Sequence, residues 1–182
     1  MPSPVLFGIS AAFGLAVWGT VAWHYIWPAL RGHPSPENLK PILLLHGFRF
    51  LGLAFLLPGV VSSQLPATFA QPVAYGDFIS AILALLALAT LGTRTGTTLT
   101  WVFNIFGTAD LLFAFYLGGR ISLPDTPGLL GAGYFILAAY VPLLLITHGL
   151  AFRILLRTKA VAPSPSREEA ASAQEVVLRR AR

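Results

Sequence analysis

The sequence predicts an all-α membrane protein, a bundle of five transmembrane helices. Hydrophobic residues make up 55% of the 182 residues, only 10% are charged, and the mean hydropathy is +0.73. A soluble domain, by contrast, is about 25% charged. Polar or proline-rich segments divide the chain into five apolar runs, each close to the roughly 20 residues that one span needs. The lipid bilayer is therefore the expected partner, and we expect a multi-pass protein of the inner membrane.

The predicted spans cover about residues 5–30, 41–61, 72–91, 98–117 and 129–152. Pro142 lies inside the last span and predicts a kink that frees a backbone carbonyl one turn earlier. Residues 1–157 are thus expected to form one bundle. From Thr158 the chain is rich in Ala, Ser, Pro and charge. Residues 158–182 are therefore expected to be a disordered cytoplasmic tail that holds at most a short helix after Ser166.

The first predicted span has two further features. The residues before it include no Lys or Arg, so it is expected to be a retained anchor and not a cleaved signal peptide. Small residues recur at every fourth position, at Gly8, Ala12, Ala16 and Thr20. This pattern is typical of membrane helices that approach one another closely, so it indicates a packing face.

The distribution of Lys and Arg predicts the orientation. In a five-span chain Arg120 falls on one side, whereas six basic residues fall on the other: Arg31, Lys40, Arg94, Arg153, Arg157 and Lys159. Because positively charged loops stay in the cytoplasm, the N-terminus is expected outside and the C-terminal tail inside. Membrane topology thus explains the net charge of +5, and nucleic acid is not an expected partner.

The chain has no cysteine, which excludes disulfides, thiolate haem ligands, iron–sulfur clusters and a cysteine nucleophile. The motifs of nucleotide-phosphate loops, zinc proteases and serine hydrolases are also absent. The sequence leaves open whether the protein is an enzyme.

Three histidines are predicted to lie at similar depth. His46 lies five residues after Pro41 and His148 five residues before Arg153. At about 1.5 Å per helical residue each is roughly 8 Å below the cytoplasmic boundary, and His24 is at roughly 10 Å. A single membrane histidine is as often a packing residue as a functional one, but a shared depth favours function. His24, His46 and His148 are therefore candidate metal ligands.

Charged and amide side chains extend this polar layer. Arg49 follows His46 by three residues, and Asn104, Gly107 and Asp110 follow one another at the same spacing. Because a charge near the bilayer centre costs roughly 2.5–3.5 kcal/mol, we predict that Arg49 pairs with Asp110. Such a pair is as often a structural salt bridge as a substrate site. Asp77, near the start of its predicted span, is expected in a different layer.

A glycine follows two of these histidines, at Gly47 and Gly149. A glycine beside a ligand leaves room for a flat macrocycle, and bis-histidine haem sites need two imidazoles on facing helices at similar depth. In these positions the chain resembles membrane-bound b-type cytochromes. The resemblance implies haem b as a cofactor, bound by His46 and His148. From their depth and charge, Arg49 and Asp110 are expected to tune the charge at this site, and Asn104, in the same layer, completes the expected cofactor-binding set.

Three functions therefore remain. The first is a small cofactor-binding protein in electron transfer or sensing, with haem b or a metal ion. The second is a small transporter or proton-coupled carrier in which Asp110, Arg49 and His46 line a path, although the chain shows no inverted repeat and one mid-span proline. The third is an accessory subunit of a larger complex, and a homo-oligomer is equally open.

Overall fold

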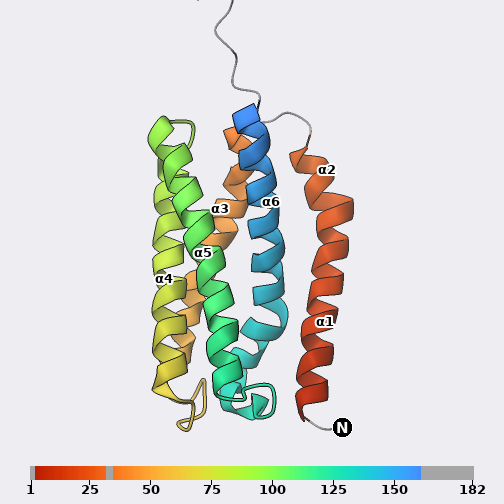
Figure 1. The fold of residues 1–182 in the computed structure, drawn as a ribbon, viewed down its shortest axis with the longest axis vertical. Helices are drawn as coiled ribbons and strands as arrows, with labels where there is room; N and C mark the ends of the chain where they lie inside the picture. Colours follow the sequence, from red (N-terminus) through yellow and green to blue (C-terminus); the bar gives the residue numbers. More distant parts are fainter. Residues whose placement is uncertain (1–2, 32–34, 161–182) are drawn as a thin grey trace, which may run out of the picture.

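The computed structural model describes residues 3–31 and 35–160, with side chains as far as Arg157 (Figure 1). The chain is all-α over these residues, as predicted. Five helical segments are long and apolar enough to cross a membrane: Ser3–Leu30, Pro36–Leu56, Ala67–Ala89, Arg94–Arg120 and Ile136–Arg157. The tail from residue 161 onward, including the helix expected after Ser166, lies outside the described residues.

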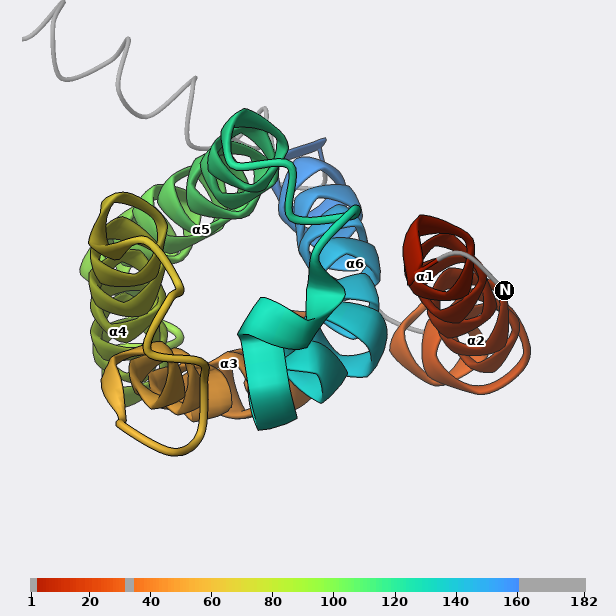
Figure 2. The same ribbon diagram turned by 90° about the horizontal axis from the view of Figure 1, so that it is seen from below.

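Four of the five spans surround a common interior, and the first lies outside them (Figure 2). The four are α3 (Lys40–Gly47) with its extension η3 (Phe48–Leu56), α4 (Ala67–Ala89), α5 (Arg94–Arg120) and α6 (Val141–Ala160). The first span consists of α1 (Ser3–Val21) and α2 (Trp27–Leu30), joined by a π-helical turn, and packs against α6 and the turn before it.

The second span changes from an α-helix to a 3-10 helix at Phe48. A 3-10 helix has three residues per turn, so positions three apart lie directly above one another. Residues Leu43, His46, Arg49, Gly52 and Phe55, spaced by three, are all buried. In a continuous α-helix, each residue of this row would point about 60° away from the one three positions earlier. The 3-10 segment therefore keeps Arg49 on the face that looks into the bundle.

Two π-helical turns precede prolines, at Ala22–Ile26 before Pro28 and at Ile136–Tyr140 before Pro142. Proline has no N–H to donate to the residue four positions earlier. The helix irregularity expected at Pro142 is present as the π-helical turn Ile136–Tyr140. The carbonyl of Ala139 in this turn accepts a hydrogen bond of 2.9 Å from Trp18 Nε1 of α1.

The packing face of α1 differs from the predicted one. A Cβ at Gly8 would meet no atom of the described residues within 4 Å, and Ala12, Ala16 and Thr20 are exposed. Gly14 instead lies against the carbonyl oxygen of Ala138 and against Pro142. The small-residue stripe is thus directed outward, because the π turn before Pro142 presents its carbonyl groups to the neighbouring face of α1.

Two apolar clusters fill the bundle, one toward each end. The first includes Leu43, Phe103 and Ile154, and the second includes Phe55, Phe69 and Leu130. The polar residues lie between these clusters. In four antiparallel spans, residues from the middle of each helix necessarily meet in one layer.

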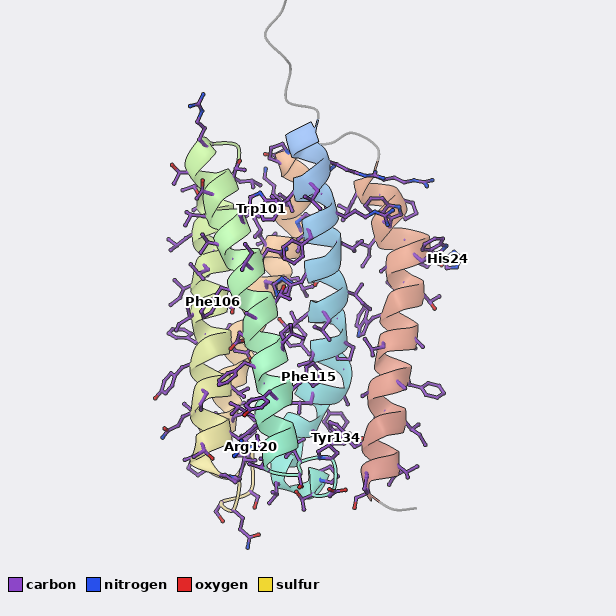
Figure 3. The ribbon with its side chains drawn as sticks, in the orientation of Figure 1. His24, Trp101, Phe106, Phe115, Arg120 and Tyr134 are labelled. Atoms are coloured by element: carbon purple, nitrogen blue, oxygen red, sulfur yellow. The ribbon has the colours of Figure 1, made fainter. Side chains whose placement is uncertain are left out.

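The basic residues lie at the ends that the sequence predicts. Arg31, Lys40, Arg94, Arg153 and Arg157 stand where spans begin or end at one end of the bundle, and Arg120 stands at the other (Figure 3). Arg153 and Arg157 lie over the indole ring of Trp27, at 4.5 and 4.7 Å from its centroid. These contacts attach the first span to α6 at that end.

We predict that Gly14→Val separates α1 from the bundle. A Cβ at Gly14 would collide with the Ala138 carbonyl and lie 3.1 Å from Pro142 Cγ, and overpacking of this kind costs about 1–3 kcal/mol. Thermal unfolding in detergent should show a lower midpoint for this variant. Gly8→Val, the same change at an open position of the same helix, is the control; equal midpoints would contradict the packing.

Candidate functional site

Arg49 lies at the centre of the polar layer with its side chain fully buried. Its Nε donates to Asp77 Oδ1 at 2.7 Å, and Nη2 contacts the same oxygen at 2.7 Å and Asp110 Oδ2 at 2.6 Å. Its Nη1 donates to the Gly107 carbonyl at 3.1 Å and lies 3.2 Å from His148 Nε2. One guanidinium on the second span is therefore bound to α4, α5 and α6.

Glycines on three helices make room for this arrangement. A Cβ at Gly107 would lie 2.7 Å from His148 Cε1 and 2.8 Å from Arg49 Nη1. A Cβ at Gly76 would overlap the Asp110 carboxylate, and one at Gly52 would overlap that of Asp77. A side chain at any of the three positions would displace a charged group of the cluster.

The hydrogen bonds of His148 determine its tautomer. Arginine can only donate, so His148 Nε2 accepts from Arg49 and carries no proton. His148 Nδ1 then donates to Asn104 Oδ1 at 2.7 Å, while Asn104 Nδ2 donates to the backbone carbonyl of His148 at 3.3 Å. His148 is therefore a neutral imidazole that the Asn104 amide holds in place.

Within the described residues, one ring nitrogen of His46 is hydrogen-bonded and the other is not. The hydroxyl of Thr147 donates to the carbonyl of Leu143 or Leu144, at 2.8 and 3.0 Å, so its oxygen accepts from His46 Nε2 at 2.9 Å. His46 Nδ1 and Ser80 Oγ on α4 are buried and have no hydrogen-bond partner within the described residues. His46 precedes Arg49 by three residues, and Ser80 follows Asp77 by three residues. Because the two helices are antiparallel, both lie on the same side of the Arg49–Asp77 pair.

The predicted pairing of Arg49 with Asp110 is confirmed. The placement of Asp77 in another layer is wrong, because Asp77 binds the same guanidinium. A span that begins at about Pro72, as the sequence predicts, would place Asp77 near a helix start. The structure begins α4 at Ala67 and carries Pro72 inside it, so Asp77 lies ten residues into the helix, about 15 Å along its axis.

The three candidate metal ligands do not come together. His46 and His148 are in contact, but His24 is exposed on the outer side of the first span and points away from the bundle (Figure 3). Within the described residues no group of three His, Asp or Glu side chains could hold a metal ion. Depth along a helix does not fix the direction of a side chain, which depends on rotation about the helix axis, and this rotation turns His24 outward.

The two buried histidines do not fit haem b in this arrangement. Their ring centroids are 4.2 Å apart, which is direct ring contact and leaves no space for a macrocycle between them. Their Nε2 atoms are hydrogen-bonded to different residues, Thr147 and Arg49. A Cβ at Gly47 would lie 3.2 Å from the side chain of Leu85, whereas a Cβ at Gly149 would meet no described atom within 4 Å. Gly149 is exposed, so the open space beside it lies on the outer face of α6 and not between the two histidine rings.

Sequence reasoning missed the roles of Asp77, Thr147, Gly52 and Gly76. The spacing of three that joins His46, Arg49 and Gly52 was a usable signal, because it is the period of a 3-10 helix. Thr147 had none, since its role depends on a histidine 101 residues away.

Comparison with known proteins gives a family and no functional relative. The family described as "Domain of unknown function (DUF8737)" matches residues 6–156, which include the whole polar layer. No curated protein and no solved structure matches the chain.

We predict that Arg49 and Asp110 are energetically coupled. Arg49→Met leaves two buried carboxylates unpaired, and Asp110→Leu leaves the guanidinium with one carboxylate partner where it had two. Losing one partner of a buried pair costs roughly 3–5 kcal/mol. The double variant should lose less than the sum of the single losses in detergent unfolding. Its loss should still be appreciable, since Asp77 remains without its cation.

Arg120→Met is the control for this cycle. Arg120 lies at the end of the bundle and donates to Tyr116 Oη at 3.2 Å in an exposed position, so its loss should change stability little. Additive losses for Arg49→Met and Asp110→Leu would rule out coupling.

Proposed function

The chain belongs to the DUF8737 family, whose description names no activity, and we propose from the site that it is a small proton-coupled carrier in which Asp77 and Asp110 hold the coupling proton. The observation that carries the proposal is that two carboxylates share a single guanidinium in the interior of a membrane bundle.

The charges of the cluster do not balance. Arg49 is always positive, while ionised Asp77 and Asp110 contribute two negative charges. Among the described residues Arg49 is the one cation bonded to either carboxylate, and His148 is neutral because it accepts from Arg49. Carboxylates on the same nitrogen repel one another, and an unpaired charge in a membrane interior is costly. A proton on one carboxyl group removes the excess charge.

The remaining titratable groups around the cluster leave this balance unchanged. His46 lies on α3, donates to Thr147 and contacts the ring of His148. Tyr140, the residue directly before α6, donates from its hydroxyl group to the Leu45 carbonyl at 2.9 Å. Both groups are neutral in these bonds. The proton therefore resides on Asp77 or Asp110, each of which has one oxygen that accepts no hydrogen bond within the described chain.

The irregular helices favour a carrier over a static salt bridge. Transporters often use interrupted helices at their central site, and π turns and 3-10 segments within helices are frequent at functional positions. Here Arg49 is the second residue of a 3-10 segment, and the π turn Ile136–Tyr140 precedes the helix that carries His148.

The haem hypothesis has less support, since the histidine rings are in contact with one another. A Soret band in purified protein that disappears in both His46→Ala and His148→Ala would restore it. Titration of Asp110 distinguishes the two hypotheses. The proton site requires this carboxyl group to gain and lose a proton, whereas a haem or metal centre does not.

We predict a protonated carboxyl group that titrates within the membrane interior. Infrared difference spectra of the protein in lipid, recorded between high and low pH, should show the carbonyl stretch of a protonated carboxyl group. The band should be lost or shifted in Asp110→Asn or Asp77→Asn, because either change lets Arg49 neutralise the one remaining carboxylate. Asp125→Asn, in the exposed turn after α5, should leave the band unchanged. A band that survives both changes in the cluster would contradict the proposal.

We also propose that the protein lies in the inner membrane with its N-terminus outside, because the basic residues gather at the opposite end of the first span. A reporter that is active only in the periplasm should be silent after Arg157 and active after Arg120. The reverse pattern would overturn this orientation.

A further inference from the structure

A cavity of about 70 Å³ reaches the acidic side of the cluster. Its walls come from α1, η3, α4, α5, the turn after α5 and the segment that leads into α6. Four phenylalanines contribute: Phe7, Phe55, Phe69 and Phe115. Gly118, Gly119 and Pro124 also line it, so the cavity extends toward the end of the bundle where Arg120 lies.

The polar lining of the cavity is purely acidic. Among the described residues that line the cavity, Asp77 and Asp110 are the only ones with polar side chains, and Arg49 does not line it. The side chains of Asp77 and Asp110 are 9% and 10% exposed, whereas that of Arg49 is 0% exposed. A molecule in the cavity thus meets carboxylates and no guanidinium, so the charge selects a cation and disfavours an anion.

The shape restricts the apolar part of such a ligand. An apolar cavity of roughly 150 Å³ holds a benzene ring, and this cavity, at about 70 Å³, has about half that volume. A single alkyl chain is thinner than a ring. The lining residues Phe115, Gly119 and Pro124 are exposed, so part of the cavity wall lies at the surface of the bundle, where such a chain can leave it. The lining offers hydrocarbon and phenyl surface, which stabilises a chain by burial and a nearby cation through the ring faces.

We propose that this cavity binds single-chain alkylammonium ions, with the ammonium group on Asp110 beside Asp77 and the alkyl chain among the phenylalanines. The inference rests on the proposed carrier function, for which it names the class of substrate. Binding exchanges cations: the ammonium ion takes the place of the proton on the carboxyl group, and that proton leaves to solvent. The ammonium ion and the proton compete for one carboxylate, so binding of the ligand is coupled to release of the proton.

The test uses octylammonium as the probe and the full-length protein in lipid nanodiscs, with empty nanodiscs subtracted. Calorimetry in two buffers of different ionisation enthalpy should show binding together with proton release. Octan-1-ol and octanoate have the same chain without the positive charge and should bind at least about thirtyfold more weakly, the factor that corresponds to roughly 2 kcal/mol.

Two variants locate the site. Asp110→Asn should abolish proton release and weaken octylammonium binding by a similar factor. Ala114→Leu, which places a larger side chain in the cavity wall one helical turn from Asp110 and keeps both carboxylates in the sequence, should weaken binding while the titrating infrared band remains. Ala12→Leu, on the exposed face of α1, is the matched control and should bind as the unmodified protein does.

The outcomes separate the two proposals. Equal binding of octan-1-ol and octylammonium, or undiminished binding in Ala114→Leu, would overturn the alkylammonium site. Absence of octylammonium binding together with a titrating carboxyl band would overturn the substrate class and leave the proton site standing. Absence of the band would remove the proton site itself.

Discussion

The burial of one guanidinium is the constraint on which this structure depends. An arginine in hydrocarbon must find an acceptor for each of its donors, because unpaired donors and a bare charge are costly there. Arg49 finds them on three other spans: a carboxylate on α4, a carboxylate and a carbonyl on α5, and an imidazole on α6. The relative heights of four helices are therefore tied to a single side chain.

This constraint explains features that would otherwise look like irregularities. Glycines stand at positions 52, 76 and 107 because the charged groups occupy the space that a Cβ would take. The 3-10 segment holds Arg49 and Gly52 on one face of the second span. Apolar clusters lie on both sides of the layer and keep the ion pairs in a medium of low dielectric constant, where their attraction is strong.

The cluster is asymmetric, and this asymmetry carries the functional argument. On one side Arg49 is closed off by His148, which Asn104 orients and which packs against His46 and Phe103. On the other side the two carboxylates border an apolar cavity. A purely structural ion pair has no need of a second carboxylate or of access to one. An exchange site needs both, since a cation has to arrive and leave while the rest of the network keeps its shape.

The sequence by itself determined the five apolar helices, the gathering of basic residues at one end and the pairing of Arg49 with Asp110. Each follows from composition and from distance along a helix, and the cost of a charge in lipid depends on little else. The tertiary structure alone decided the direction of each side chain and the start of α4. Rotation about a helix axis separated His24 from the other histidines and turned Gly8 outward, while five additional residues before Pro72 brought Asp77 to Arg49. The depth of a residue can be counted along the chain. The direction of its side chain about the helix axis depends on which neighbours pack against which face, and contacts between distant residues set that packing.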